Sequence, residues 1–513
     1  MKAQDKVVVL DFGSQFTQLI ARRVRESRIY SEIVPFDTPI EEIRKLNPKA
    51  LILSGGPSSV YDDEAPIASQ EIIDMDIPIL GICYGMQLLG YYFGAKIKAA
   101  PKKEYGRAEL TIVEDDALFD GFNGESIVWM SHADKIEELP QGFKKLGYTE
   151  NSDFAAIRHI EKSIYGLQFH PEVAHTEKGS LIIENFVRKV SEIEGDWTTR
   201  VFIEDSIKDI KKRVGNEKVL CAVSGGVDST VMAVLLNRAL GENVTCVFID
   251  TGLLRLNEAE KTMKMFSEID GMNVQLFERK ENFYSALAGI GDPEDKRKAI
   301  GKTFIDVFND IAAEFDEHKF LAQGTLYPDV IESNPVKGPS ETIKSHHNVG
   351  GLPKDMKFEL IEPFRELFKD EVRIVGREFG LSEEVIGRHP FPGPGLAIRC
   401  PGEVTESDLE LLRSADDIFI SELHKSGYYE KVWQAFAVLL PVKSVGVMGD
   451  KRTYSKVISL RSVTSVDGMT ADWGRLPLEL LSKISDRIIN EVEGVNRVLY
   501  DISSKPPATI EWE

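Results

Sequence analysis

Short apolar runs, each followed by a turn and an amphipathic stretch, recur along the first three quarters of the chain. Strands that alternate with helices in this way form an α/β sheet whose faces the helices cover. The first series of runs comprises residues 6–10, 50–53, 78–82 and 164–169. The second series comprises residues 219–223, 244–249, 274–277 and 320–322, at the spacing of βαβ units. The sequence therefore predicts two α/β units, the second built on a parallel sheet.

The chain is too long for one hydrophobic core. It has 513 residues, whereas single cores stop growing near about 250–300 residues. The stretch EGDWTT at residues 194–199 has the composition of a linker, and the alternating pattern ends near residue 388. We therefore predict three domains, comprising residues 1–197, 198–388 and 389–513.

The region after residue 388 has a different pattern. It contains helical candidates near 404–425 and 476–492 and long strand candidates at 435–448 and 454–464. This pattern predicts a small α+β domain. Before it, residues 333–353 are rich in Gly, Pro and polar side chains, which favours a lid or a binding loop over a packed element.

The charge balance of the chain restricts its partners. The net charge is 62 − 83 = −21, so we expect no binding to nucleic acid or to an anionic membrane, and any phosphate must be held in a local pocket. No apolar run approaches the ~18 residues of a membrane span, and the polar start has no signal-peptide pattern. Four cysteines without a CxxC pair do not form a disulfide framework. We therefore expect a cytoplasmic protein.

One cysteine lies between two glycines at the end of a strand candidate. Residues 78–82 lead into the GxCxG pattern around Cys83, and a helical stretch follows. Glycines at these positions permit a tight strand-to-helix turn that presents a nucleophile at the edge of a sheet. On its own, the pattern is equally consistent with a buried cysteine that has glycine neighbours.

Two further strand ends carry groups that a cysteine nucleophile needs. His170 and Glu172 follow the run at 164–169, where an imidazole could deprotonate a thiol and a carboxylate could orient the imidazole. The glycine turn at Gly56 could supply amides for an oxyanion hole together with the amide of Tyr84. His170 alone would be interpreted as a core histidine, but the three signals together favour a catalytic triad.

These motifs resemble those of class I (triad) glutamine amidotransferases over most of residues 6–195. The similar segments are DFGSQ at 11–15, LSGGP at 53–57, GICYGMQ at 81–87 and QFHPE at 168–172. The resemblance implies that Cys83 attacks the glutamine side-chain amide, with His170 as general base and acid and Glu172 as its orienter. It also implies that the amides of Gly56 and Tyr84 stabilise the oxyanion and that Gln87 helps to bind glutamine.

A second motif, LCAVSGGVDST at residues 220–230, predicts a strand, a phosphate-binding loop and a helix. The lysine of a Walker A loop is absent. The motif resembles the pyrophosphate-binding loop of N-type ATP pyrophosphatases, an adenine-nucleotide-hydrolase-like fold. The resemblance implies cleavage of ATP to AMP and pyrophosphate with Mg²⁺, and Asp228 is the candidate metal contact. The implied ATP-binding residues are Ser224, Gly225, Gly226, Val227, Asp228, Ser229, Thr230, Asp250 and Gly324.

A glutaminase and an adenylating unit in one chain resemble the GMP synthetase family of the bacterial type. RHPFPGPGL at 388–396 and KPPATIEWE at 505–513 are similar to segments of its C-terminal domain, so that the resemblance covers the whole chain. It implies amination of xanthosine monophosphate (XMP) and a homodimer formed through the third domain. The residues it implies for XMP binding and adenylation are Asp329, Glu332, Lys344, Arg388, Arg497, Lys505 and Glu511.

Two other functions stay open at this point. One is another adenylating amidotransferase or a tRNA-thiolating enzyme, which would need a second reactive cysteine and a basic groove for RNA. The other is a non-catalytic nucleotide sensor, in which triad or loop residues would be lost. The full motif set and the acidic charge favour the amination of XMP. Taken one at a time, the basic residues are better explained as parts of a solvated surface, whereas Asp329 and Glu332 fit a solvated surface and a binding site equally well.

Overall fold

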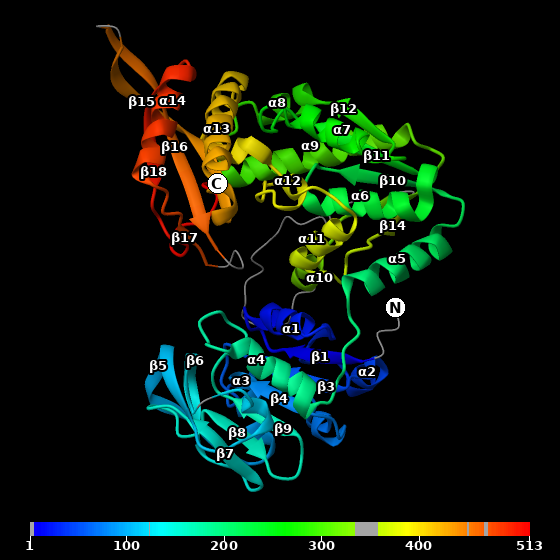
Figure 1. Ribbon diagram of the computed structural model, residues 1–513, viewed down its shortest axis with the longest axis vertical. Coiled ribbons are helices and arrows are strands. Elements are labelled where there is room, and N and C mark those ends of the chain that lie inside the picture. Colours follow the sequence, from blue (N-terminus) through cyan, green and yellow to red (C-terminus); the bar gives the residue numbers. More distant parts are fainter. Residues whose placement is uncertain (1–4, 123, 334–357, 449–450, 466–469) are drawn as a thin grey trace. The chain divides into compact units, whose positions relative to one another are not determined.

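The computed structural model describes residues 5–122, 124–333, 358–448, 451–465 and 470–513. The chain divides into two compact units (Figure 1). The first comprises the described residues up to 205 together with 327–333, and the second comprises 206–326 together with the described residues from 358 onward. Within these described parts, no helix is both long enough and apolar enough to span a membrane.

A nine-stranded sheet forms the first unit, in the order β2-β1-β3-β4-β9-β8-β7-β5-β6. Its strands are β1 (Lys6–Asp11), β2 (Tyr30–Pro35), β3 (Ala50–Leu53), β4 (Ile79–Ile82), β5 (Lys96–Ile112), β6 (Glu125–Glu138), β7 (Phe143–Tyr148), β8 (Ala156–His159) and β9 (Ile164–Leu167). The pairs from β2 to β9 are parallel and the rest are antiparallel. The central strands are buried along their length, as parallel strands covered on both faces must be.

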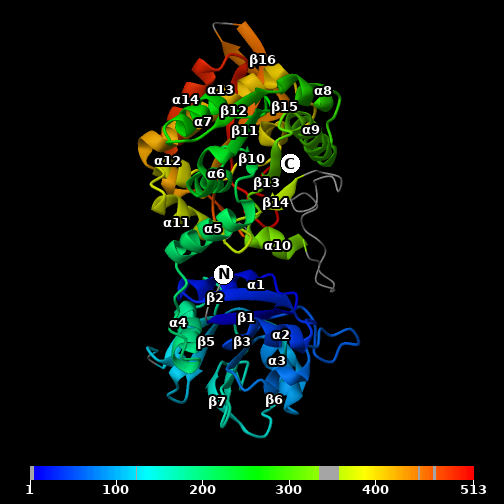
Figure 2. The same cartoon turned by 90° about the vertical axis from the view of Figure 1, so that its right-hand side faces the viewer.

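Helices cover both faces of the parallel half of this sheet. The helices of this unit are α1 (Thr17–Glu26), α2 (Ile40–Leu46), α3 (Tyr84–Tyr92) and α4 (Gly179–Asn185), with η1 (Gln70–Asp74), η2 (Ala117–Phe119), the π-helical η3 (Phe186–Val190) and α10 (Tyr327–Ser333). Figure 2 shows α4 on one face and α2 and α3 on the other. The second face is packed by one core cluster, which contains Ile43 of α2 and Leu88 of α3. Because β3, β4 and β9 are parallel neighbours, their carboxyl ends meet at the same edge of the sheet.

The second unit contains a five-stranded parallel sheet in the order β12-β11-β10-β13-β14. Its strands are β10 (Lys218–Val223), β11 (Val244–Asp250), β12 (Val274–Glu278), β13 (His318–Ala322) and β14 (Glu359–Ile361). The accompanying helices are α5 (Thr199–Val214), α6 (Val227–Leu240), α7 (Glu258–Ser267), α8 (Lys280–Leu287), α9 (Pro293–Ala313), α11 (Lys369–Glu378) and α12 (Glu383–Ile386), with η4 (Gly241–Asn243).

A second sheet in the same unit has four strands. The elements of this part are η5 (Gly395–Arg399), α13 (Glu406–Ser426), η6 (Tyr429–Lys431), β15 (Gln434–Met448), β16 (Lys451–Thr464), β17 (Asp472–Trp473), α14 (Leu478–Glu491) and β18 (Val495–Asp501). The long β15 and β16 are antiparallel, and β18 pairs with β16 in parallel. This mixed sheet with two helices agrees with the predicted α+β character.

Local sequence signals explain where several of these helices begin and end. At the start of α9, Pro293 occupies the first turn and the Asp292 carboxylate accepts from the amides of Glu294 and Asp295. The Thr405 side chain caps α13, which ends at Gly427 with φ 67°, a left-handed conformation that glycine adopts without strain. These caps satisfy helix-end groups that would otherwise be unpaired.

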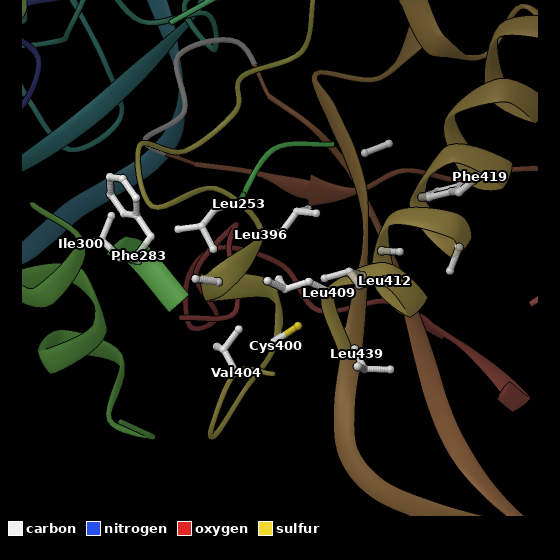
Figure 3. Close-up of a cluster of buried hydrophobic side chains, with 14 of the residues drawn as sticks. Leu253, Phe283, Ile300, Leu396, Cys400, Val404, Leu409, Leu412, Phe419 and Leu439 are labelled. Atoms are coloured by element: carbon white, nitrogen blue, oxygen red, sulfur yellow. The ribbon is translucent and has the colours of Figure 1, made fainter. Parts of the chain in front are cut away.

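One hydrophobic core joins the two sheets of the second unit (Figure 3). It packs Leu253 and Ile300 from the parallel-sheet region with Leu396, Leu409 and Leu439 from the later region. Because this core is continuous, the residues before 388 and those after it belong to one compact unit. The division into three domains, with boundaries after residues 197 and 388, stays a prediction.

The predicted strands are present with small shifts at their ends, and the α/β fold class is confirmed. The sequence interpretation did not include the long β5–β6 hairpin of the first unit, β14 or β18. Most of the predicted lid, including Lys344, lies outside the described residues.

Candidate active sites

Cys83 lies at the turn between β4 and α3. Its backbone has φ 51° and ψ −104°, a combination that L-residues rarely adopt and that a surrounding structure must hold in place. The two flanking glycines make the turn possible. A Cβ on Gly85 would lie 2.4 Å from the Leu53 carbonyl oxygen, and one on Gly81 would lie 2.5 Å from the Gly85 carbonyl oxygen. The chain thus folds into a strained elbow with a buried thiol at its tip.

His170 and Glu172 form a buried pair just beyond β9. The Nδ1 atom of His170 lies 2.7 Å from Oε1 of Glu172, and the Glu172 side chain is fully buried. The backbone of His170 is also held, because the Thr176 hydroxyl donates to the His170 carbonyl oxygen at 2.6 Å. Burial acts against protonation of the ring, but the Glu172 charge and the contact with the Cys83 thiol raise the pKa of His170 well above its usual value. The predicted triad members are therefore brought together.

The predicted oxyanion and glutamine-binding residues also lie around the elbow. Gly56 packs so closely that a Cβ there would lie 2.8 Å from the Phe12 carbonyl oxygen and 3.3 Å from the Tyr84 ring. Gln87 donates from Nε2 to the carbonyl oxygen of Asp134 at 2.8 Å. The Gln87 amide is thus engaged with β6, and a role in binding glutamine stays a prediction.

Two residues that contact the thiol were not among the predicted site residues. The Cys83 thiol donates to the Ser131 carbonyl oxygen at 3.5 Å, and the Gln168 amide donates to Sγ at 3.8 Å. Gln168 is fully buried and begins the QFHPE motif, so the motif itself was a signal for it. Ser131 carried no local signal, because its approach depends on the pairing of β5 with β6.

In the second unit, the glycine loop between β10 and α6 folds around its two serines. Ser224 and Ser229 hydroxyls lie 3.1 Å apart, and the Ser229 hydroxyl also accepts from the Ser224 amide at 3.1 Å. Gly225 has φ 72°, and a Cβ there would lie 2.9 Å from the Thr262 hydroxyl. Val227 begins α6 and is buried together with Thr230, so the loop sits on a packed helix start.

Charged side chains surround this loop. Asp228 places Oδ2 3.2 Å from Nζ of Lys369 at the start of α11, and its Oδ1 is buried without a partner among the described residues. Arg388 donates to the Gly225 carbonyl oxygen at 2.8 Å and also binds the Glu258 carboxylate. Arg388 therefore ties the loop to α7, which is a structural contact that the sequence interpretation did not foresee. Lys369 was missed because nothing in its sequence neighbourhood marks it.

The other predicted ATP-binding residues lie at neighbouring strand ends. A Cβ on Gly324 would be 3.9 Å from the Ser229 amide nitrogen, so the backbone after β13 approaches the loop. Asp250, at the end of β11, accepts from the Gly252 amide at 2.8 Å and lies 3.2 Å from Nζ of Lys280. The Asp250 charge raises the pKa of Lys280.

The residues predicted to hold XMP lie on different segments of the second unit. Glu511 forms a two-pronged ion pair with buried Arg399, at 2.9 and 3.0 Å, and accepts from Gln434 at 2.7 Å. Arg497 lies on β18, where it donates to the Ser444 hydroxyl at 2.6 Å. Lys505 pairs through its backbone with Ala471. Arg399 and Gln434 were missed, although Arg399 lies just after the glycine-proline segment.

The remaining predicted residues lie on or beyond α10. Asp329 belongs to the first half of that helix, which clusters with the first unit, and Glu332 lies in its last turn. Lys344 is outside the described residues. No group of three or more His, Cys, Asp or Glu side chains arranged to hold a metal occurs within the described ranges.

Comparisons with known proteins agree with this division of the chain. Family models match for glutamine amidotransferase class-I over residues 8–190, NAD synthase over 200–299 and GMP synthase C terminal domain over 421–512. GMP synthase [glutamine-hydrolyzing] of Aquifex aeolicus (strain VF5) is 58% identical over 507 residues, 99% of each chain. The protein of that name from Maridesulfovibrio salexigens is 56% identical over 515 residues, 100% of each chain.

The chain belongs to the glutamine-hydrolysing GMP synthase family. The family prediction is confirmed, and members of this family are ligases that carry a glutamine amidotransferase domain and carry out glutamine-dependent GMP synthesis. Among solved structures, one described as a GMP synthase subunit of Thermoplasma acidophilum is 33% identical and covers 37% of this chain and 94% of its own, with a TM-score of 0.35. A glutamine amidotransferase from Thermotoga maritima is 19% identical over 37% of this chain and 99% of its own, with a TM-score of 0.31.

Proposed function

We propose that the chain makes GMP from XMP, ATP and glutamine, with glutamine hydrolysis at Cys83 and adenylation at the glycine loop of the second unit. The observation that carries the proposal is the buried His170–Glu172 pair, 2.7 Å apart, next to a cysteine at a strained elbow. Family membership supplies ATP as a substrate and makes the other adenylating amidotransferases and the tRNA-thiolating enzymes poor alternatives.

In the glutaminase reaction, His170 holds the proton of the Cys83 thiol before the attack, and the resulting thiolate Sγ attacks the side-chain carbonyl carbon of glutamine. The Glu172 carboxylate stabilises the imidazolium that results. The amides of Gly56 and Tyr84 then hold the oxyanion, and His170 returns the proton to the departing ammonia. Water hydrolyses the thioester by the same route in reverse, which releases glutamate and regenerates the thiol.

In the synthetase reaction, the amides and hydroxyls of the loop from Ser224 to Thr230 bind the β- and γ-phosphates of ATP. A carbonyl oxygen of XMP attacks the α-phosphorus, pyrophosphate leaves, and ammonia then displaces AMP from the activated carbon. The approach of Gly324 to the Ser229 amide supports a single nucleotide site built from the loop and the end of β13. Asp250 lies at the end of the adjacent strand β11 and is proposed to line the same site.

Magnesium would be held at Asp228. Its buried Oδ1 atom has no partner among the described residues, and carboxylate oxygens together with phosphate oxygens are the ligands that Mg²⁺ prefers. When bound, the ion neutralises phosphate charge. Lys369 contacts the other carboxylate oxygen, Oδ2, at 3.2 Å, so that Oδ1 is the oxygen that would contact the ion.

For XMP we propose the basic residues Arg388, Arg497 and Lys505 together with Glu511. Asp329, Glu332 and Lys344 are proposed for adenylation. Arg388 is already at the loop, which supports a role near the nucleotide. Arg399 and Gln434 join this proposal because both contact Glu511.

Three broader properties are also proposed. The chain is proposed to be a cytoplasmic homodimer. It is also proposed to bind neither nucleic acid nor membrane, and the net charge of −21 supports this last point. Its domains comprise residues 1–197, 198–388 and 389–513, and the separate four-stranded sheet supports the last boundary. The dimer is proposed to form through the third domain.

The test is whether the full chain converts XMP to GMP in the presence of ATP, Mg²⁺ and glutamine. The change in absorbance measures the conversion. Products are identified by chromatography. Release of AMP and pyrophosphate is expected, whereas release of ADP and phosphate would refute cleavage at the α-phosphorus. Light scattering tests the dimer, and a mass corresponding to one chain would refute it.

A further inference from the structure

A short segment of β6 faces the beginning of α3, where the nucleophile lies. The Ser131 carbonyl oxygen accepts from the Cys83 thiol at 3.5 Å. Three residues later, the Asp134 carbonyl oxygen accepts from Nε2 of Gln87 at 2.8 Å. The Cys83 thiol and the Gln87 side-chain amide therefore both donate hydrogen bonds to backbone carbonyl oxygens within residues 131–134. Any displacement of that segment would change what surrounds the thiol.

His132 lies inside this segment and is almost completely buried, with 1% of its side chain exposed. Its Nδ1 atom is 3.0 Å from the Asp134 carbonyl oxygen, and its Nε2 atom is 3.2 Å from Oε2 of Glu104. A carbonyl oxygen and an ionised carboxylate can only accept hydrogen bonds, so both contacts require a proton on the ring nitrogen. A neutral imidazole carries one such proton. Both bonds are made only by an imidazolium.

Glu104 is equipped to be the counter-ion. It lies directly opposite His132 in the antiparallel pairing of β5 with β6, so that the two side chains share one face of the sheet. The Thr149 hydroxyl donates to its Oε1 at 3.2 Å, and the Asn151 amide donates at 3.5 Å. Burial acts to raise the pKa of Glu104, but the bond to His132, its charge and these two donors together lower it. The carboxylate is therefore ionised.

We propose that Glu104 and His132 form a buried carboxylate–imidazolium pair that positions residues 131–134 against Cys83 and Gln87 for glutamine hydrolysis. Both are positioning residues, because their side chains contact each other, Asp134, Thr149 and Asn151 and act on the thiol only through the backbone of residues 131–134. The inference rests on the proposed role of Cys83. Removing one partner would leave the other charge buried without compensation, and the segment would then rearrange to relieve it.

The protonation state can be measured directly on the full chain. Histidine would be labelled with ¹⁵N, and among the 9 histidines the His132→Gln variant identifies the ring by the signal that it removes. Because both ring nitrogens face acceptors, we expect both nitrogens of His132 to carry protons in the unaltered chain. In Glu104→Gln, one of the two nitrogens should lose its proton. A neutral His132 ring in the unaltered chain would overturn the proposal.

Kinetics test the positioning role. We expect Glu104→Gln to lower kcat/KM for glutamine by about 100-fold, the size of effect that a misplaced catalytic group produces. Ammonia-dependent GMP synthesis should be unchanged, because that reaction bypasses the glutaminase site. Glu109→Gln is the matched control, since Glu109 lies on the same strand with an exposed side chain. An unchanged kcat/KM in Glu104→Gln would overturn the positioning role.

A double variant distinguishes loss of positioning from misfolding caused by an unpaired buried charge. Glu104→Gln together with His132→Gln removes both charges, so no unpaired charge is left in the interior. We expect this variant to fold, as judged by circular dichroism, and still to hydrolyse glutamine poorly, whereas a normal rate would refute the proposal. Glutamine-dependent synthesis by Cys83→Ala would instead refute the proposed function, while the NMR result on His132 would remain valid.

Discussion

The glutaminase site and the nucleotide loop are both built at strand ends, but their polar groups are in different states. At the first site, His170 and Glu172 are buried and already bonded to each other at 2.7 Å. At the second, Asp228 and Lys369 keep 25% and 45% of their side chains exposed, and the loop serines bond to one another and to the Gly226 backbone. The first site is organised before its substrate arrives. The second has groups that a phosphate chain can take over by exchanging partners.

The sharpest test of this contrast is Cys83→Ala. The preorganised site depends on its nucleophile, so glutamine-dependent GMP synthesis should fall by at least about 10⁴-fold, as for other triad nucleophiles. Synthesis with added ammonium should stay near the unaltered rate, because the loop of the second unit is untouched. Both rates are measured by absorbance on the same preparation. Loss of the ammonium-dependent rate as well would show that the two sites are not separable in this way.

Glu172→Gln tests whether the buried pair is the organising element. An amide cannot stabilise the imidazolium, and the equivalent change in a serine triad costs about 10⁴-fold. Because the Thr176 hydroxyl still holds the His170 backbone, we expect a loss of about 10³–10⁴-fold in glutaminase kcat with little change in KM. Steady-state measurement of glutamate release provides both constants. A change in KM alone would mean that Glu172 binds substrate and does not act on His170.

Asp228→Asn tests the exchangeable site. Loss of the carboxylate should reduce pyrophosphate release by about 10²–10³-fold with either nitrogen source, the range for removal of one electrostatic contact to the transition state. A coupled pyrophosphate assay measures the rate. Asp370→Asn, at a neighbouring acidic residue in the first turn of α11, is the matched control and should have much less effect. Equal losses in the two variants would remove Asp228 from its proposed role.

The smallest expected effect concerns stability and pH. The Glu172 charge raises the pKa of His170, so the folded ring keeps its proton at pH values where the unfolded ring, with its usual pKa near 6.5, has lost it. The contribution is complete below about pH 6.5 and declines as pH rises through the raised pKa, by at most about 1.4 kcal/mol per pH unit. Urea unfolding of the first unit should show this slope, and Glu172→Gln should reduce it. Identical slopes would show that His170 is not protonated in the folded chain.

How much of each site could be predicted depended on the sequence separation of its parts. The elbow around Cys83 and the loop from Ser224 to Thr230 are short patterns, and the parallel arrangement then places consecutive strand ends at one edge. The Glu104–His132 contact joins residues 28 apart through a hairpin register, and Arg399 meets Glu511 across 112 residues. Register and tertiary packing set such pairs, so no local pattern indicates them.

The same limit applies to the fold. Apolar runs that are buried on both faces gave clear strands such as β3 and β11. In contrast, β5 has 17 residues of mixed polarity and was not recognised as a strand. Lys369 shows the limit at the second site, because only the packing of α11 brings its ammonium group to Asp228.

The continuous core of the second unit bears on how a gene for such a protein could be divided. A break in the coding sequence near residue 388 would leave Leu253 and Ile300 on one product and Leu396, Leu409 and Leu439 on the other, each with an apolar face open to water. Two such fragments would have to find each other during synthesis or aggregate. Gene fission is therefore disfavoured within the synthetase part.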